Sequence, residues 1–163
     1  MTTGSPAEHV AEAQKLTADA LVDLYELTLN DGLTFLRFKD GPSVTWQTKT
    51  YESVACRITG LGQNADGSKT RPLLTVMNPE GVWNSFIHAG LCEGALVTRR
   101  QVLRQYLEGN IGISDPSFWY IGRVKEMVKS AGVTFELRSL SDGPDVKIPA
   151  RVYLPPDFPF VTI

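Results

Sequence analysis

Cysteine and histidine are scarce in this chain, which contains two of each among its 163 residues. Cys56 and Cys92 lie far apart in the sequence and form no CxxC pair, so the pattern indicates neither a zinc site nor a disulfide framework. A single bridge between them is one interpretation. Two buried thiols in a reducing compartment is the interpretation that we favour. The sequence therefore predicts no metal ion and no cofactor.

Long apolar runs and an excess of one charge are also missing. No apolar run approaches the roughly 20 residues that a membrane span requires, and the N-terminus lacks the basic and then apolar order of a secretory signal. The 18 acidic residues nearly balance the 16 basic ones, so the net charge is −2 and gives no electrostatic case for nucleic acid as the main partner. We expect a soluble protein that is made in the cytoplasm and does not insert into a membrane.

Catalytic motifs are incomplete wherever the sequence approaches one. Residues 60–65 spell GxGxxA, but a dinucleotide site needs a helix directly afterwards, and Asp66 and Pro72 follow instead. No serine sits in a GxSxG sequence. His9 falls in a weakly apolar helical segment and His88 flanks an apolar stripe, so we expect structural roles for both. The sequence therefore predicts that this protein is not an enzyme.

What is present is the periodicity of one β-rich domain. At 163 residues and 42% hydrophobic content, the chain is long enough to bury about 70% of its unfolded surface around one core. We predict a mainly β (β-rich α+β) fold, an antiparallel β-sandwich or barrel-like domain over residues 19–154. A helical arm at residues 1–18 precedes this domain, and a proline-rich apolar arm at residues 155–163 follows it.

A hairpin is predicted near the start of the domain. Asn30-Asp31-Gly32 is a strong turn signal between the strand-like runs at residues 21–29 and 33–38. Asp23, Glu26 and Asp31 are scattered around this hairpin, and we interpret them as solvated charges and a poor metal cluster. Further strands are predicted at residues 44–46, 51–59, 118–128, 133–138 and 146–154, and the last three form an antiparallel meander with one wet face.

The central stretch, residues 70–107, reads as strand, helix and strand. Leu73, Leu74, Val76 and Met77 predict a strand covered on both faces. Asn78 and Pro79 signal the start of a helix near residues 79–91, which carries an apolar stripe with Trp83, and Gly90 and Gly94 signal its end. Residues 95–107 fit either a helix end or an alternating strand, and we favour the strand.

Candidate interaction residues come from the basic and the exposed apolar segments. Arg99, Arg100 and Arg104 form the one basic concentration. We favour a salt-bridged strand face for it; the alternative is a surface that contacts a partner or DNA, since arginine is the cation best suited to interface pairing. Aromatic residues of the apolar terminal arm either lie back on the core or grip a partner subunit. The candidates are Arg71, Trp83, Arg99, Arg100, Arg104, Phe158 and Phe160.

A collinear set of short motifs resembles one protein family. The motifs are residues 44–47 (VTWQ) with Tyr51, residues 70–76 (TRPLLTV) with Asn78, and further segments at residues 97–100 (VTRR), 115–116 (DP) and 148–152 (IPARV). In order and spacing this set is similar to the minor tail protein L family of long, flexible-tailed phages of the lambda type. The resemblance covers about residues 20–153.

The resemblance implies a structural role in the phage tail tip or baseplate, between the distal end of the tail tube and the central hub. It implies a threefold ring (a homotrimer) around the channel, with the central hub or fibre protein and the distal tail protein as partners and DNA only as a transient passenger. Longer family members carry a C-terminal iron–sulfur cluster, but no cysteine follows Cys92 here, so the cluster does not carry over. The rival hypotheses are a small cytoplasmic enzyme or ligand-binding β-barrel, and a nucleic-acid binder that uses the arginines.

Removing residues 155–163 tests the assignment of the terminal arm. We expect the truncated chain to enter tail assemblies less well, because the apolar arm would grip a neighbour, and to keep its melting temperature. Thermal unfolding and recovery of the chain in purified tails measure the two effects. A large drop in melting temperature would instead place the arm in the core.

Overall fold

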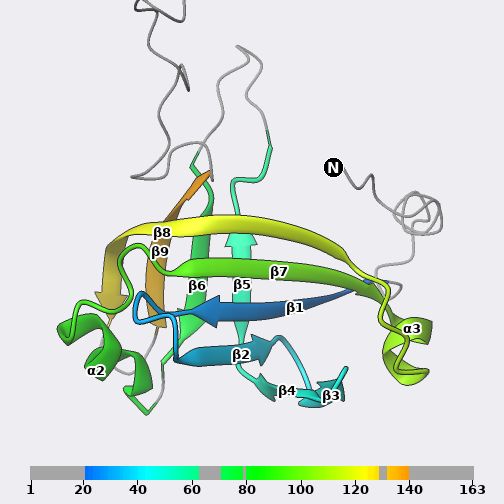
Figure 1. The fold of residues 1–163 in the computed structure, drawn as a ribbon. Helices are drawn as coiled ribbons and strands as arrows, with labels where there is room; N and C mark the ends of the chain where they lie inside the picture. Colours follow the sequence, from blue (N-terminus) through cyan, green and yellow to red (C-terminus); the bar gives the residue numbers. More distant parts are fainter. Residues whose placement is uncertain (1–20, 63–70, 79, 129–131, 140–163) are drawn as a thin grey trace, which may run out of the picture.

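The computed structural model describes residues 21–62, 71–78, 80–128 and 132–139. Within them the chain forms nine strands and two helices (Figure 1). In chain order they are β1 (Leu21–Thr28), β2 (Phe35–Lys39), β3 (Val44–Trp46), β4 (Lys49–Ser53), β5 (Cys56–Thr59), β6 (Leu73–Met77), α2 (Val82–His88), β7 (Leu96–Leu103), α3 (Arg104–Glu108), β8 (Asp115–Val128) and β9 (Gly132–Ser139). The predicted N-terminal helix, the strand at residues 146–154 and the C-terminal arm lie outside the described residues.

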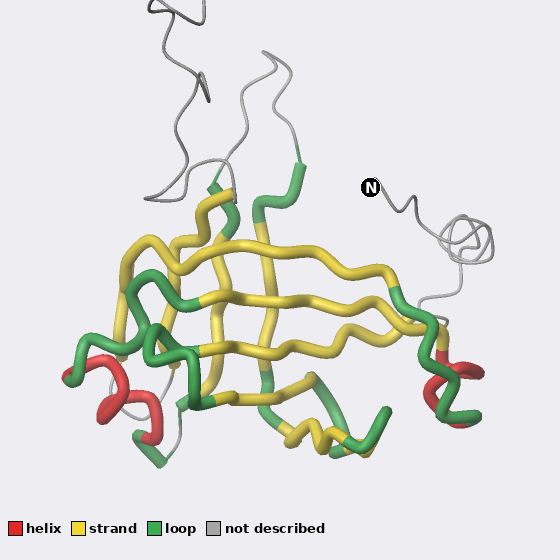
Figure 2. Tube along the Cα trace, viewed as in Figure 1, coloured by secondary structure: helices red, strands yellow, loops and turns green. Residues whose placement is uncertain are grey.

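The strands form one sheet in the order β3-β4-β2-β1-β7-β8-β9-β6-β5. Its pairs are antiparallel except for β2 with β4. The mainly β class is therefore confirmed, and the strands belong to a single sheet rather than to two separate ones. The two helices sit at opposite ends of it (Figure 2). No described helix is both long and apolar enough to cross a membrane.

The predicted hairpin joins β1 to β2. The Asp31 carboxylate accepts hydrogen bonds from the backbone N–H groups of Leu33 and Thr34, both at 3.0 Å, and from the Thr34 hydroxyl at 2.7 Å. Gly32 supplies the positive φ of 68° that the turn needs. The register then places Tyr25 opposite Phe38. The Asn-Asp-Gly signal predicted this turn because the chemistry of a tight turn is local.

The long strand β8 folds the sheet over itself. Its first half pairs with β7 and its second half with β9, and two register shifts interrupt the second ladder. Such bulges bend a strand, and Figure 1 shows β8 curving so that β9, β6 and β5 cross behind β7 and β1. At the first shift, a Cβ on Gly122 would lie 2.4 Å from Nε of Arg138, so glycine leaves space for that side chain. The bend creates two layers from one sheet.

The main hydrophobic cluster fills the space between these layers. It combines buried side chains of β1, β2, β6, β7, β8 and β9 with Trp83 of α2. Successive ring centroids from Tyr25 to Phe38, Trp83 and Phe135 lie 5.6, 5.6 and 5.7 Å apart. A second, smaller cluster packs β3, β4 and α3 against the other face of β1 and β7. The first cluster fixes how the sheet closes, because its aromatic chain spans both layers.

The central stretch differs from the sequence prediction in two details. The helix is present, but it begins at Val82 rather than at residue 79, and Asn78 still helps to start it by accepting the Trp83 backbone N–H at 3.2 Å. The helix ends at His88 rather than near residue 91, and Gly90, one of the two predicted stop residues, follows it with a φ of 70°. The prediction that β6 is covered on both faces is wrong, because Met77 is 44% exposed. The strand alternates, since only one of its faces meets the main cluster.

Two other predicted strands are divided. Residues 95–107 form strand β7 up to Leu103 and helix α3 from Arg104, so the favoured strand is correct for the first part and the helical alternative for the last. Residues 51–59 contribute the end of β4 and all of β5, which are separated at Val54 and Ala55. Hydrophobic alternation alone does not mark such breaks, since side chains on both sides of each break still pack inward.

The substitution Trp83→Ala tests the central position of the aromatic chain. Trp83 is 5% exposed and contacts both layers, so we expect the free energy of unfolding to fall by about 3–5 kcal/mol. Urea denaturation measures this. Val82→Ala, at a neighbouring side chain that is 53% exposed, is the control and should change stability by less than about 0.5 kcal/mol. Equal effects of the two variants would contradict the assignment.

Candidate interaction surfaces

The sheet has a second face, which we call the outer face, opposite the main hydrophobic cluster. Side chains alternate along β1, so Tyr25 and Leu27 face the cluster and Glu26 and Thr28 face the opposite way. The register continues this outer face across β2, β7, β8 and β9. Beyond the area that β3, β4 and α3 cover, it carries two buried carboxylates with arginines around them.

Glu26 is the first of these carboxylates and is 6% exposed. Nε of Arg37 and Nζ of Lys49 donate to its Oε2 at 2.5 and 2.9 Å, and Nη1 of Arg100 donates to its Oε1 at 3.3 Å. Burial by itself raises the pKa of Glu26, but the hydrogen bonds from Arg37 and Lys49 and the charge of Arg100 outweigh it and hold the pKa below its ordinary value. Three cations share one carboxylate, so the cluster keeps a net positive charge.

Glu136 repeats this arrangement on β9 and is also 6% exposed. Nη1 of Arg71 donates to its Oε1 at 2.7 Å, and Nε of Arg123 donates to its Oε2 at 3.0 Å. The hydrogen bond from Arg71, followed by the hydrogen bond and charge of Arg123, lowers the pKa of Glu136. The two arginine side chains are 57% and 63% exposed. Their outer parts are therefore available for contact with another molecule.

Exposed aromatic side chains lie beside the Glu26 cluster. Phe35 pairs across the sheet with Thr28, and Phe118 pairs with Thr98, which itself pairs with Glu26. The two phenylalanines are 46% and 42% exposed. The guanidinium carbon of Arg37 lies 5.4 Å from the centroid of the Phe35 ring, a cation–π distance. Arginine and aromatic residues together are the composition enriched at protein interfaces.

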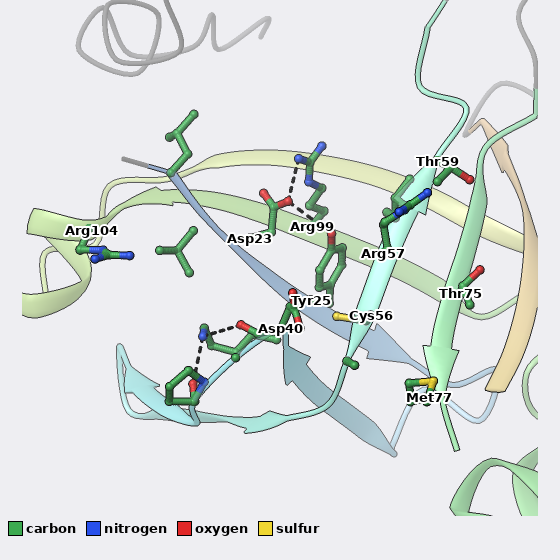
Figure 3. A pocket seen from close by; sticks show the side chains of 17 residues that line it. Asp23, Tyr25, Asp40, Cys56, Arg57, Thr59, Thr75, Met77, Arg99 and Arg104 are labelled. Atoms are coloured by element: carbon green, nitrogen blue, oxygen red, sulfur yellow. Dashed lines mark hydrogen bonds and ion pairs between the residues drawn. The ribbon is translucent and has the colours of Figure 1, made fainter. Parts of the chain in front are cut away.

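A cleft of about 970 Å³ opens on the inner side, between β1 and β5 (Figure 3). Asp23 of β1 accepts hydrogen bonds there from Nη2 of Arg99 at 2.9 Å, from Nε2 of Gln101 at 3.2 Å and from the Tyr25 hydroxyl at 3.4 Å. Burial, followed by the charge of Asp23, raises the pKa of Tyr25 well above its usual range. The tyrosine therefore stays a neutral donor to Asp23.

Further cations line the same cleft. Lys39 is 6% exposed, and its Nζ donates to the carbonyl groups of Asp40 at 2.7 Å and of Pro42 at 2.9 Å. Arg57 of β5 and Arg104 of α3 also line the cleft (Figure 3). With Arg99, four cationic side chains line the cleft against two carboxylates, those of Asp23 and Asp40.

The two thiols are poorly suited to nucleophilic chemistry. Cys56 and Cys92 are free thiols, the first half-buried at the cleft and the second buried in the core. Burial raises the pKa of Cys56 to about 12 and that of Cys92 to about 11, and in each case nearby carboxylates add to the effect. Both thiols are therefore protonated at neutral pH. Among the described residues, no group of three or more His, Cys, Asp or Glu side chains is placed to hold a metal ion.

The four predicted arginines are all on strands or next to them. Arg99 and Arg100 form ion pairs with Asp23 and Glu26 of β1, so the predicted ion pairing of this segment is confirmed for these two residues. Arg71 binds Glu136, and Arg104 begins α3 beside the cleft. The structure does not bring the four together, because Arg99 faces the cleft and Arg100 the outer face.

The aromatic candidates lie elsewhere. Trp83 is buried in the main cluster, so its side chain is not part of the surface. Phe158 and Phe160 lie outside the described residues.

Sequence reasoning missed the two carboxylates around which the arginines gather. The interpretation of Glu26 as a solvated charge is wrong, because three cations from β2, β4 and β7 cover it. The predicted alternation places Glu136 on the solvent-exposed face of its strand, but it is buried under Arg71 and Arg123. The abundance of arginine in strand segments was a usable signal, but the pairings depend on strand register between distant parts of the chain.

Comparisons with known proteins found a matching family, a related sequence and a similar fold. A family model described as phage minor tail protein L matches residues 28–158. Tail tip protein L of Escherichia phage lambda is 27% identical over 170 residues, which cover 90% of this chain and 70% of that protein. A solved chain from the virion of a native gene transfer agent particle has a TM-score of 0.58 at 18% identity, over 92% of this chain and 50% of that one. The chain thus spans half the length of that solved chain, and this likeness shows the fold alone.

The described residues form a mainly β fold whose charged side chains are largely bound to one another on the outer face and in the cleft. The chain belongs to the phage minor tail protein L family. It is a structural component of the virion tail, in a family that is not one of enzymes.

Glu26→Gln tests the shared carboxylate. The variant leaves Arg37, Lys49 and Arg100 without their counter-charge, so we expect the free energy of unfolding at pH 7 to fall by about 1–3 kcal/mol. Because the pKa of Glu26 lies below the ordinary value of 4.5 in the folded chain, its stabilisation is complete above that pH and is lost as the pH falls through the folded-state pKa. Urea denaturation between pH 7 and pH 3 measures both effects.

The matched control for this variant is Glu52→Gln, an exposed carboxylate on β4. It should shift stability by less than about 0.5 kcal/mol at any pH in this range. A difference between wild type and Glu26→Gln that stays constant from pH 7 to pH 3 would show that the charge of Glu26 does not stabilise the fold.

Proposed function

We propose that this chain is part of the tail tip or baseplate, where it joins the distal end of the tail tube to the central hub. Family membership and the name of the lambda relative, tail tip protein L, support this position. The proposed partners are the central hub or fibre protein, the distal tail protein and further copies of this chain. The chain would be assembled with them in the host cytoplasm and remain in the virion.

We also propose a threefold ring, a homotrimer, that surrounds the channel for DNA. A net charge of −2 supports a subunit that lets DNA pass without holding it, because retention would need a basic surface. Three of the candidate arginines, Arg71, Arg99 and Arg100, are each bound to a carboxylate, which reduces the positive charge that they offer to DNA. DNA is then a transient passenger rather than a ligand.

The observation that carries the proposed role in the tail tip is the composition of the outer face. Phe35 and Phe118 are almost half exposed beside a carboxylate with three cations, and Arg71 and Arg123 project from a second such carboxylate. Buried carboxylates bind the charged ends of these cations and hold them in place, so less side-chain entropy remains to be lost on contact. A face of this kind fits a protein neighbour with apolar and acidic groups.

The cleft is the described feature that bears on the rival hypothesis of a ligand-binding β-barrel. Asp23 and Arg99 bind each other there, and the ammonium of Lys39 is held by two carbonyl groups. The thiol of Cys56 beside them is protonated. Asp23, Arg99 and Lys39 are thus already bound within the chain itself, which argues against a small-ligand site built on these three side chains.

The double variant Phe35→Ser with Phe118→Ser tests the outer face. We expect a loss of at least about tenfold in co-elution with the neighbouring tail-tip proteins on size-exclusion chromatography after co-expression, because the aromatic anchors of the contact are gone. The melting temperature should fall by only a few degrees, since both rings are partly exposed.

Leu33→Ser is the control for this experiment. Leu33 is an apolar side chain in the β1–β2 turn, is 83% exposed, and should leave co-elution unchanged. Failure of the wild-type chain to co-elute with any tail-tip protein would contradict the proposed position. Unchanged co-elution of the double variant would show that another face makes the contact.

A further inference from the structure

Strand β5 is an edge of the sheet. In the strand order of the described residues, β5 is last and pairs only with β6. An exposed edge carries unpaired N–H and C=O groups that can accept a further strand. Short edge strands are common and need no partner by themselves, so the surroundings of β5 decide what this edge does.

The hydrogen-bond pattern shows which backbone groups of β5 are free. Ala55 accepts the N–H of Met77, so residues of odd number on this strand face β6. Val54 donates its N–H to the carbonyl of Lys39, the last residue of β2, so residues of even number face the other way. Cys56 and Ile58 continue that second direction after β2 has ended. Their backbone groups therefore face the cleft, with no described strand beside them.

The cleft beside this edge lies where a further strand would pair with β5. It is lined along the whole of β5 on one side and by the first residues of β1 with Arg99 on the other (Figure 3). In Figure 1, β5 and β6 cross behind β1 and β7 and cover only part of them. A strand added to β5 would extend this back layer over the part that holds Asp23 and Arg99.

Charge identifies the chemistry of the added strand. Two carboxylates, Asp23 and Asp40, face four cations across the cleft, which are Lys39, Arg57, Arg99 and Arg104. Asp23 neutralises Arg99, whereas the contacts of Lys39 with Asp40 and Pro42 are to neutral carbonyl groups. Arg57 stands on β5 itself and is exposed. The net positive cleft fits a segment that carries acidic side chains.

We propose that this cleft receives an extended, acidic segment of another virion protein, which adds to the free edge of β5 as a strand. This inference rests on the proposed function, because it requires a neighbour in the tail. Backbone hydrogen bonds to Cys56 and Ile58 provide affinity, and pairing of acidic side chains with the exposed Arg57 selects the segment. The contact is separate from the outer face, so one subunit can bind two neighbours at once.

Hydrogen exchange of the β5 amides tests the proposal directly. The full chain alone and the full chain in purified virions are compared by mass spectrometry of peptides that cover residues 54–60. We expect the amides of Cys56 and Ile58 to exchange rapidly in the isolated chain and at least about 100-fold more slowly in virions. The amide of Arg57, which faces β6, is the internal control and should be protected in both.

The outcomes separate this inference from the proposed function. Absence of the chain from virions contradicts the proposed function itself. Presence in virions with rapid exchange at Cys56 and Ile58 overturns only the added strand. Protection of both amides already in the isolated chain shows that a segment of this chain fills the edge, and it also overturns the proposal.

A charge variant tests the acidic character of the segment. Arg57→Glu should lower the amount of chain in purified virions at least about tenfold at an unchanged melting temperature, because it places a carboxylate against the incoming acidic groups. Lys125→Glu, an exposed change of the same kind on β8, is the matched control and should enter virions as the wild type does. Normal incorporation of Arg57→Glu would overturn the assignment of an acidic segment.

Discussion

The bend in β8 is the constraint on which the rest of this structure depends. One strand of 14 residues belongs to two ladders, and the register shifts within the second ladder turn it behind the first. Only this turn brings Phe135 of β9 against Trp83 and so closes the main core. The same turn determines how far the back layer reaches. Both the packed core and the open cleft therefore follow from where one strand changes direction.

Buried carboxylates organise the surface in a second, independent way. Desolvation of Glu26 opposes its charge, and only the cations from three other strands make the charged form favourable. Glu136 shows the same principle with two arginines, one of them next to β6 and one on β8. Each cluster therefore ties several strands together by a contact that forms only in the correct register. Each cluster contains more cations than carboxylates, so the outer face carries a net positive charge at both clusters.

Local chemistry made a large part of the fold predictable. The Asn-Asp-Gly turn and the pairing of β8 with β9 were predicted from residues close in sequence and are confirmed. The predicted alternation is not confirmed, because Phe118 and Val128 are exposed and Glu136 is buried. Two further predictions were wrong. The exposure of one face of β6 depends on which layer covers the strand, and the start of α2 depends on a contact between Asn78 and Trp83.

The surfaces were less predictable than the strands. Arginine in β7 was a correct signal of ion pairing, but its partners lie on β1, more than 70 positions earlier in the sequence. Burial of Glu26 cannot be read from its own segment, since β2, β4 and β7 supply the cations that cover it. The free edge of β5 is visible only after the strand order is known. Sites that depend on register thus require the tertiary structure.

The strand order also has a consequence for how the chain acquires its structure. Strand β1 pairs with β7 between residues 21–28 and 96–103, and β6 pairs with β9 between residues 73–77 and 132–136. Sheets with such distant pairings fold slowly, on the order of milliseconds to seconds, because long loops must close before the paired strands can form their stabilising contacts. During synthesis, β6 lacks its central neighbour until β9 has left the ribosome. The chain therefore passes through a period with open ladders, in which a crowded cell full of other tail components is a hazard as well as a source of partners.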